Sequence, residues 1–203
     1  MSGLLESVIL QLHSKRWVRL EVEGGELRIA SLNLVGQTRL NHDLGVLLAD
    51  RLRPLLAGKT RVAMLTAVEK GLQLAQVTAW ELGLEEIAVA HNRIKPHMEP
   101  SRRPVVQAGA DSITSGDKFL AVYERDLSIL AQAKDGVILF DDVVSTGSTM
   151  LALHALLEAC ARRAGVPAPP VLAMACAAVE GHPALTPLVS LARLPNPFFE
   201  ARR

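Results

Sequence analysis

The sequence predicts an α/β fold in which a parallel β-sheet is flanked by helices. Short, fully apolar segments alternate along the chain with segments of helical pattern, each about a dozen residues long. The glycines Gly58, Gly83 and Gly165 follow three of these helical segments, as is typical of helix C-termini. Strands that alternate with helices form βαβ units, and a sheet built from such units is parallel and covered on both faces.

The expected elements follow one another at short intervals. Gly24 and Gly25 separate two strand-like segments and indicate a hairpin turn, and Asn41 is the expected N-cap of the second helix. We expect strands at residues 17–22, 27–33, 62–65, 87–90, 105–111, 119–125, 137–140, 171–179 and 188–194. We expect helices at residues 2–13, 41–57, 71–82 and 149–164.

Length and composition fit one globular domain. The chain has 203 residues, of which 49% are hydrophobic and 21% are charged, so it can bury a core. No apolar stretch reaches the length needed to span a membrane. A net charge of +1 gives no general reason to expect a nucleic-acid partner. Cys160 and Cys176 lie in apolar sequence without metal-ligand spacing, so we expect buried thiols in a reducing cytoplasm.

Two neighbouring carboxylates follow the apolar strand expected at residues 137–140. We expect this strand to be buried and to deliver Asp141 and Asp142 to the edge of the sheet where ligands bind. Adjacent carboxylates repel each other, and their burial is costly without partners. Sugar hydroxyls and a divalent cation are partners that would stabilise them. An Asp-Asp pair alone is common, so its meaning depends on the residues that follow.

The next polar residues are Ser145, Thr146, Gly147, Ser148 and Thr149. They offer hydroxyl groups, a flexible glycine and backbone N–H groups at a helix N-terminus, an arrangement that suits a phosphate dianion. The run lacks the lysine and the spacing of the nucleotide P-loop, GxxxxGK[ST]. Taken alone, these residues fit an ordinary loop and helix cap. In order after the strand and the two carboxylates, they indicate a sugar-phosphate site.

Residues 140–149, with the apolar strand before them, resemble the signature of the type I phosphoribosyltransferases at every position of that pattern. In that family the two acidic residues hold the ribose 2- and 3-hydroxyls of phosphoribosyl pyrophosphate (PRPP), and the following loop holds the 5-phosphate. The resemblance implies that Asp141 and Asp142 bind the ribose and that residues 145–149 cradle the phosphate. It also implies one domain over residues 1–203, with a core at about 41–194 and a small hood subdomain from about 1–40 and the C-terminal tail.

A second loop is similar to the pyrophosphate loop of the same family. Residues 66–75 read Thr-Ala-Val-Glu-Lys-Gly-Leu-Gln-Leu-Ala, in which Lys70 and Gly71 match the basic residue and glycine that precede the family's helix. A strand–loop–helix entry supplies backbone donors, and Lys70 adds a positive charge for an anion. The family's next strand ends in adjacent basic residues. The corresponding residues here are His91, Asn92 and Arg93, so Arg93 is the expected phosphate contact.

Two further segments look most like the adenine-phosphoribosyltransferase-related branch of the family. They read Lys-Pro-His-Met-Glu at 95–99 and Ser-Ile-Thr-Ser-Gly at 112–116. In the family this region carries a mobile lid, which we expect at about residues 100–118, where it would exclude water from the reacting centre. Relatives that use adenine carry a glutamate in that lid, for which Asp117 and Glu124 are the candidates here.

The nature of Ser145 bears on the acceptor base. Relatives that use 6-oxopurines have an aspartate at this position, where it exchanges a proton with the base, and serine cannot do so near neutral pH. We therefore expect an adenine-like acceptor. Base recognition is expected from the hood, where Phe198 or Phe199 could stack on a purine or could simply hold the tail to the body.

The predicted function is transfer of the phosphoribosyl group of PRPP to a nitrogenous base, such as the purine adenine, with release of pyrophosphate. We expect Mg2+ to be bound mainly through pyrophosphate and ribose oxygens. We also expect a homodimer that acts in the cytoplasm. The alternatives are a PRPP- or nucleotide-sensing regulatory protein with little or no turnover, and an enzyme of a pathway other than base salvage.

Overall fold

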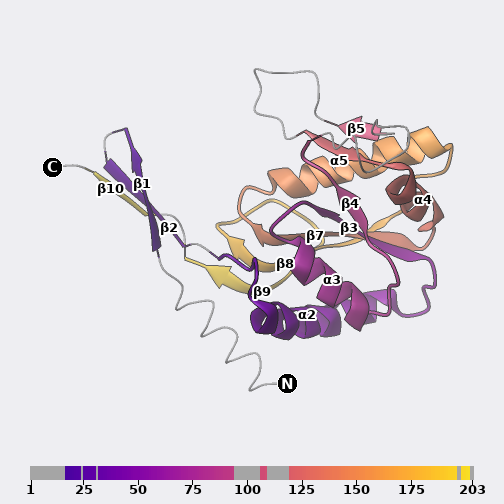
Figure 1. The fold of residues 1–203 in the computed structure, drawn as a ribbon, viewed down its shortest axis with the longest axis horizontal. Helices are drawn as coiled ribbons and strands as arrows, with labels where there is room; N and C mark the ends of the chain where they lie inside the picture. Colours follow the sequence, from indigo (N-terminus) through magenta and orange to yellow (C-terminus); the bar gives the residue numbers. More distant parts are fainter. Residues whose placement is uncertain are drawn as a thin grey trace.

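A computed structural model of the chain describes residues 17–23, 25–30, 32–93, 106–108, 119–195 and 198–201. Its centre is a five-stranded sheet with the strand order β4-β3-β7-β8-β9, in which all neighbouring strands are parallel (Figure 1). The strands of this sheet are β3 (Val62–Ala67), β4 (Ala88–Ala90), β7 (Gly136–Val144), β8 (Val171–Glu180) and β9 (Leu188–Leu194). The predicted α/β fold with a parallel sheet is confirmed.

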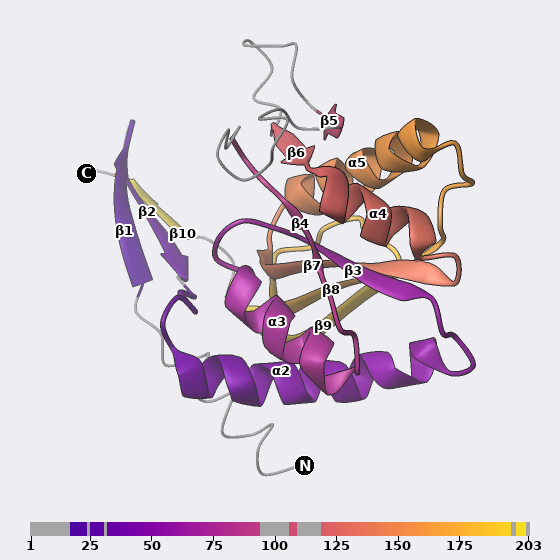
Figure 2. The same cartoon turned by 45° about the vertical axis from the view of Figure 1, so that its right-hand side comes forward.

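Helices cover both faces of the central sheet. They are α2 (Thr38–Leu52), the 3-10 helix η1 (Arg53–Leu56), α3 (Leu72–Glu81), α4 (Glu124–Gln132) and α5 (Ser148–Ala164). Figure 2 shows α2 and α3 on one face and α4 and α5 on the other. Ile138 and Phe140 of β7 belong to the core cluster beneath α2 and α3, whereas Val137 and Leu139 belong to the cluster beneath α5. Alternate side chains are thus buried on opposite faces, which explains why residues 137–140 are all apolar.

A small antiparallel sheet joins the two ends of the chain. Its strands are β1 (Trp17–Val22), β2 (Gly25–Ala30) and β10 (Phe198–Ala201), in the order β1-β2-β10. Figure 1 shows this sheet beyond the carboxyl ends of β8 and β9. The predicted hairpin is confirmed, since Val22 pairs with Gly25 across the turn. The N-terminal hairpin and the C-terminal tail, which the sequence analysis grouped as a hood, therefore contribute strands to one sheet.

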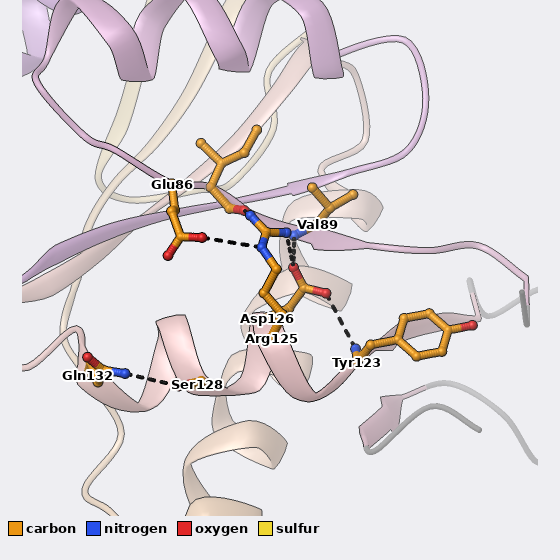
Figure 3. Close-up of polar contacts among 8 residues, drawn as sticks. Glu86, Val89, Tyr123, Arg125, Asp126, Ser128 and Gln132 are labelled. Atoms are coloured by element: carbon orange, nitrogen blue, oxygen red, sulfur yellow. Dashed lines mark hydrogen bonds and ion pairs between the residues drawn. The ribbon is translucent and has the colours of Figure 1, made fainter. Parts of the chain in front are cut away.

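A second antiparallel pair and the start of α4 differ from the prediction. β5 (Val106–Ala108) pairs with β6 (Leu120–Val122), as expected, but β6 was predicted to continue to residue 125. Helix α4 instead begins at Glu124. The buried carboxylate of Asp126 accepts hydrogen bonds from the backbone N–H groups of Val89 at 3.1 Å and Tyr123 at 3.5 Å (Figure 3). The Nη1 atom of Arg125 lies 3.3 Å from the same carboxylate. This network ties the first turn of α4 to β4, which is distant in sequence.

The start of α2 also differs from the prediction. Thr38 is the first residue of α2 and Gln37 is its N-cap, so Asn41 lies inside the helix. The buried Asn41 side chain donates through Nδ2 to the carbonyl oxygens of Leu34 at 2.6 Å and Gln37 at 2.9 Å. The expectation that Asn41 caps the helix was wrong. Its amide instead fixes the segment that leads into α2.

Several predictions fall wholly or partly on residues that the structure does not describe. They include the helix at 2–13, the segments at 95–99 and 112–116, part of the strand at 105–111, the lid at about 100–118 and the candidate carboxylate Asp117. In the described part of the chain, every helix is too short or too polar to span a membrane.

Candidate functional site

A cavity of about 730 Å³ opens at the carboxyl ends of β3, β7 and β8. The two loops that the sequence analysis selected both line it. From the β3–α3 loop come Glu69 and Lys70, and from the end of β7 and its loop come residues 141–149. The parallel sheet explains this meeting, because β3 and β7 are neighbours and their carboxyl ends share one edge.

Asp141 and Asp142 lie within β7 and not beyond it. The predicted strand ended at residue 140, but β7 continues to Val144, because Asp141 pairs with Cys176 and Val144 pairs with Val179 on β8. Asp142 is buried, with 7% of its surface exposed, and Asp141 is half-buried. The backbone N–H of Asp142 donates to Oδ1 of Asp141 at 2.9 Å. Two carboxylates on one cavity wall are acceptors suited to the paired hydroxyls of a sugar.

The loop after β7 leads directly into α5. Gly147 is the N-cap of α5 and has a φ of +84°, a left-handed conformation that favours glycine. An added Cβ at Gly147 would also lie 3.0 Å from a methyl carbon of Leu185. Thr146 Oγ1 accepts a hydrogen bond from the backbone N–H of Ser148 at 3.3 Å. The hydroxyl-bearing residues 145, 146 and 148 are exposed at the cavity, beside the N-terminus of α5, whose positive end attracts an anion.

The β3–α3 loop packs against the end of β7. Lys70 is exposed on the cavity wall, and the peptide bond between Val68 and Glu69 is cis. Gly71 is buried, and an added Cβ there would lie 3.1 Å from the backbone nitrogen of Asp142. Gly71 does not line the cavity. It allows the loop to approach β7 closely enough for Lys70 and Asp142 to share one cavity.

Some predicted site residues lie elsewhere. Arg93 is exposed and is not part of the cavity wall, whereas its neighbour Asn92 is. Glu124 is exposed at the first position of α4 and does not line the cavity. Phe199 on β10 has 49% of its surface exposed and is also not part of the wall. The side chain of Phe198 lies outside the described residues.

The sequence analysis missed Glu180, the last residue of β8, which lines the cavity. Its Oε1 atom is buried and accepts no hydrogen bond from the described residues, and burial raises the pKa of the carboxyl above its usual range. One sequence signal could have found it. Glu180 directly follows the apolar strand expected at 171–179, just as Asp141 follows the one expected at 137–140.

Comparison by sequence finds no match, either to a protein-family model or to a curated protein. Comparison by structure finds adenine phosphoribosyltransferases. The enzyme of Trypanosoma brucei, solved with AMP, pyrophosphate and ribose-5-phosphate, gives a TM-score of 0.61 at 17% identity over 93% of this chain and 79% of that one. The enzyme of Thermoanaerobacter pseudethanolicus gives 0.57 at 16% identity over 94% and 99%. The enzyme of Giardia lamblia, solved with 9-deazaadenine, gives 0.55 at 18% identity over 88% and 93%.

At these identities the likeness is one of fold. It extends over most of both chains in each comparison. The chain therefore has the type I phosphoribosyltransferase fold, in the form found in adenine phosphoribosyltransferases.

Proposed function

We propose that the protein transfers the phosphoribosyl group of PRPP to a nitrogenous base, a purine such as adenine, and releases pyrophosphate. One observation carries the proposal: a single cavity contains the carboxylates of Asp141 and Asp142, the hydroxyl-rich loop at 145–149 and the Lys70 side chain. These groups match the three polar parts of PRPP, which are the ribose hydroxyls, the 5-phosphate and the pyrophosphate. The fold shared with adenine phosphoribosyltransferases supports the same conclusion.

Each group has a separate task in this proposal. Asp141 and Asp142 accept hydrogen bonds from the ribose hydroxyls, and residues 145–149 donate to the 5-phosphate. The reaction breaks the bond between ribose C1 and a pyrophosphate oxygen and forms a bond from C1 to a ring nitrogen of the base, whose proton is released to solvent. Positive charge that develops on the ribose is favoured by the two carboxylates, and negative charge on the departing pyrophosphate is favoured by Lys70.

Magnesium fits the same cavity as a companion of the substrate. Among the described residues, no group of three or more His, Cys, Asp or Glu side chains is positioned to hold a metal ion. Asp141 and Asp142 supply carboxylate oxygens on the cavity wall, and Mg2+ usually combines one or two such ligands with water and substrate phosphates. When bound with PRPP, Mg2+ would neutralise charge on the departing pyrophosphate.

We propose the cytoplasm as the site of action, because Cys160 and Cys176 are both buried, unpaired thiols. Burial raises the pKa of each thiol to about 12, so neither is reactive near neutral pH. The homodimer implied by the resemblance is a further proposal, which light scattering of the purified protein tests.

The function is tested by turnover with PRPP, Mg2+ and a panel of nucleobases, read as pyrophosphate release. Adenine is the expected acceptor. Thermal shift measures binding separately, since a ligand bound only by the folded state raises the melting temperature. Absence of a shift with millimolar PRPP and Mg2+ would remove the proposal. Binding of PRPP without turnover of any base would favour the regulatory alternative.

A further inference from the structure

Glu180 lies at a position in the cavity that the phosphoribosyl group does not account for. The cavity residues come from strands in the sheet order β3, β7 and β8: Lys70 follows β3, Asp141 and Asp142 belong to β7, and Glu180 ends β8. In the proposed function, Lys70 takes the pyrophosphate and the two aspartates take the ribose. An incoming group approaches C1 from the face opposite the departing one. The base therefore belongs on the β8 side of the ribose, where Glu180 lies.

The connections to the small sheet support this location. Glu180 pairs with Leu194 on β9, and Leu194 is followed by Pro195 and then by β10. Leu32, which follows β2, lines the same cavity. One link to the β1-β2-β10 sheet thus leaves beside Glu180, and the other contributes a residue to the same cavity. Val144 of β7 pairs with Val179 of β8. The next residues along the two strands are Ser145 and Glu180, so these two residues occupy neighbouring positions in the chain backbone.

The surroundings of the Glu180 carboxyl favour its neutral form. Oε1 is buried and accepts no hydrogen bond from the described residues. The cation Arg193, beside Val179 in the β8–β9 pair, directs Nη1 to the carbonyl oxygen of Gly181 at 2.7 Å and towards Nδ1 of His182 at 3.3 Å. The other charged groups of the cavity wall are the carboxylates of Glu69, Asp141 and Asp142, and Lys70 on the far side. Glu180 as a whole is half-buried, and burial of a carboxyl oxygen that lacks a donor shifts the group towards its protonated form.

A neutral carboxyl presents one O–H donor beside one C=O acceptor. Such a pair matches a base edge that carries one acceptor beside one donor, as the ring nitrogen and exocyclic amino group of a 6-aminopurine do. Guanine offers a similar pair at O6 and N1–H, so a neutral carboxyl recognises a purine edge of either kind. A site built to hydrogen-bond a substrate group discriminates strongly against a ligand that leaves its polar atoms unpaired.

We propose that Glu180 is a recognition residue that binds the polar edge of the acceptor base as a neutral carboxyl. The inference rests on the proposed function, because the position of the base is deduced from the positions given to ribose and pyrophosphate. It adds a recognising group for the base from the central sheet, where the sequence analysis had looked to the hood and to residue 145.

The experiment compares the binding of AMP, GMP and ribose 5-phosphate by calorimetry. The variants are Glu180→Gln, which keeps one donor and one acceptor, Glu180→Leu, which keeps neither, and Glu180→Ala in case Leu does not fold. Exposed Glu158 on α5, in an ion pair with Arg162 at 3.9 Å, supplies the matched control Glu158→Gln. We expect wild-type protein to bind AMP more tightly than ribose 5-phosphate. Glu180→Leu should weaken AMP binding by about tenfold to a hundredfold, the range for a lost buried hydrogen-bond pair.

The other measurements separate the two proposals. Ribose 5-phosphate affinity should be unchanged in every variant, which also shows that the site is folded. Glu180→Gln should bind AMP within about threefold of wild type, because its amide replaces the neutral carboxyl. Two outcomes would overturn the inference. One is that Glu180→Leu binds AMP as tightly as wild type, and the other is that Glu180→Gln binds AMP as weakly as Glu180→Leu. Wild-type protein that binds AMP no better than ribose 5-phosphate would overturn it and leave the phosphoribosyl site standing. Failure of wild type to bind any of these ligands would overturn both.

Discussion

Gly71 lies directly against the backbone of Asp142: a Cβ added to Gly71 would be 3.1 Å from the Asp142 amide nitrogen and 3.4 Å from the Cα and carbonyl carbon of Asp141. Its φ of −77° suits any residue, so the need for glycine here comes from contact and not from conformation. Main-chain packing therefore fixes the position of the β3–α3 loop relative to the end of β7. A substitution that moves the β3–α3 loop should also move Asp141 and Asp142.

Gly71→Ala should weaken PRPP binding by about tenfold, or ~1.4 kcal/mol, because the added methyl group separates Lys70 from the two aspartates. Calorimetric titration with PRPP and Mg2+ measures this. Gly45→Ala is the matched control, since its Cβ would lie 2.5 Å from Cγ1 of Val77 in the α2–α3 contact. That variant should lose stability while its PRPP affinity stays unchanged. Equal loss of affinity in both variants would mean that Gly71 acts only through general stability.

Changing both Asp141 and Asp142 to Asn should abolish ribose-dependent binding and leave the melting temperature unchanged or higher. Two close carboxylates are electrostatically unfavourable without ligand, and Asn removes their charge with little change of shape. The control is Asp135→Asn. Asp135 accepts hydrogen bonds from the N–H groups of Thr60 and Arg61 at 2.8 Å, which lower its pKa, and it lies outside the cavity. It should lower stability and spare binding. A double variant that binds PRPP as wild type does would show that the pair is structural.

Ser145→Asp should raise activity towards hypoxanthine relative to adenine. A missing acid or base costs about 10²–10⁴-fold in rate, and the new carboxyl would supply a group that exchanges a proton with the base. The new charge lies beside the 5-phosphate loop, so the KM for PRPP should rise. Steady-state kinetics with both bases measure the two effects, and Ser145→Asn controls for size. Wild-type protein that already prefers hypoxanthine or guanine to adenine would contradict the argument from Ser145.

The raised pKa of Glu180 predicts a pH-dependent difference in stability between wild type and Glu180→Gln. Below the ordinary glutamate pKa of 4.5, the residue is protonated in both folded and unfolded chains, so it adds no pH dependence. As the pH rises from there through the raised folded pKa, the unfolded chain releases the proton first, and wild type loses stability relative to Gln. Urea unfolding of both proteins between about pH 4 and 8 measures the gap. A constant gap would contradict the raised pKa.

Segments whose pattern is set by the sheet itself were predictable from the sequence. Residues 137–140 and 171–179 are read correctly as strands because burial on both faces leaves little choice of residue. The same logic brought residues 141–149 and Lys70 to one cavity. The failures depend on partners that are distant in sequence. Asp126 holds the first turn of α4 to β4 through the N–H of Val89, and β7 continues past residue 140 because β8 pairs with it. Glu180 becomes a cavity residue only once β7 and β8 are side by side.

The pairing of β2 with β10 has a consequence during synthesis of the chain. Arg28 pairs with Phe198, so the outer edge of β2 has no partner until nearly the whole sequence has left the ribosome. At about 5–20 residues per second, this delay is on the order of ten seconds or more. All five strands of the central sheet emerge before β10 does. The hairpin edge should therefore stay open while most of the central sheet emerges, and that edge is where a chaperone would be needed.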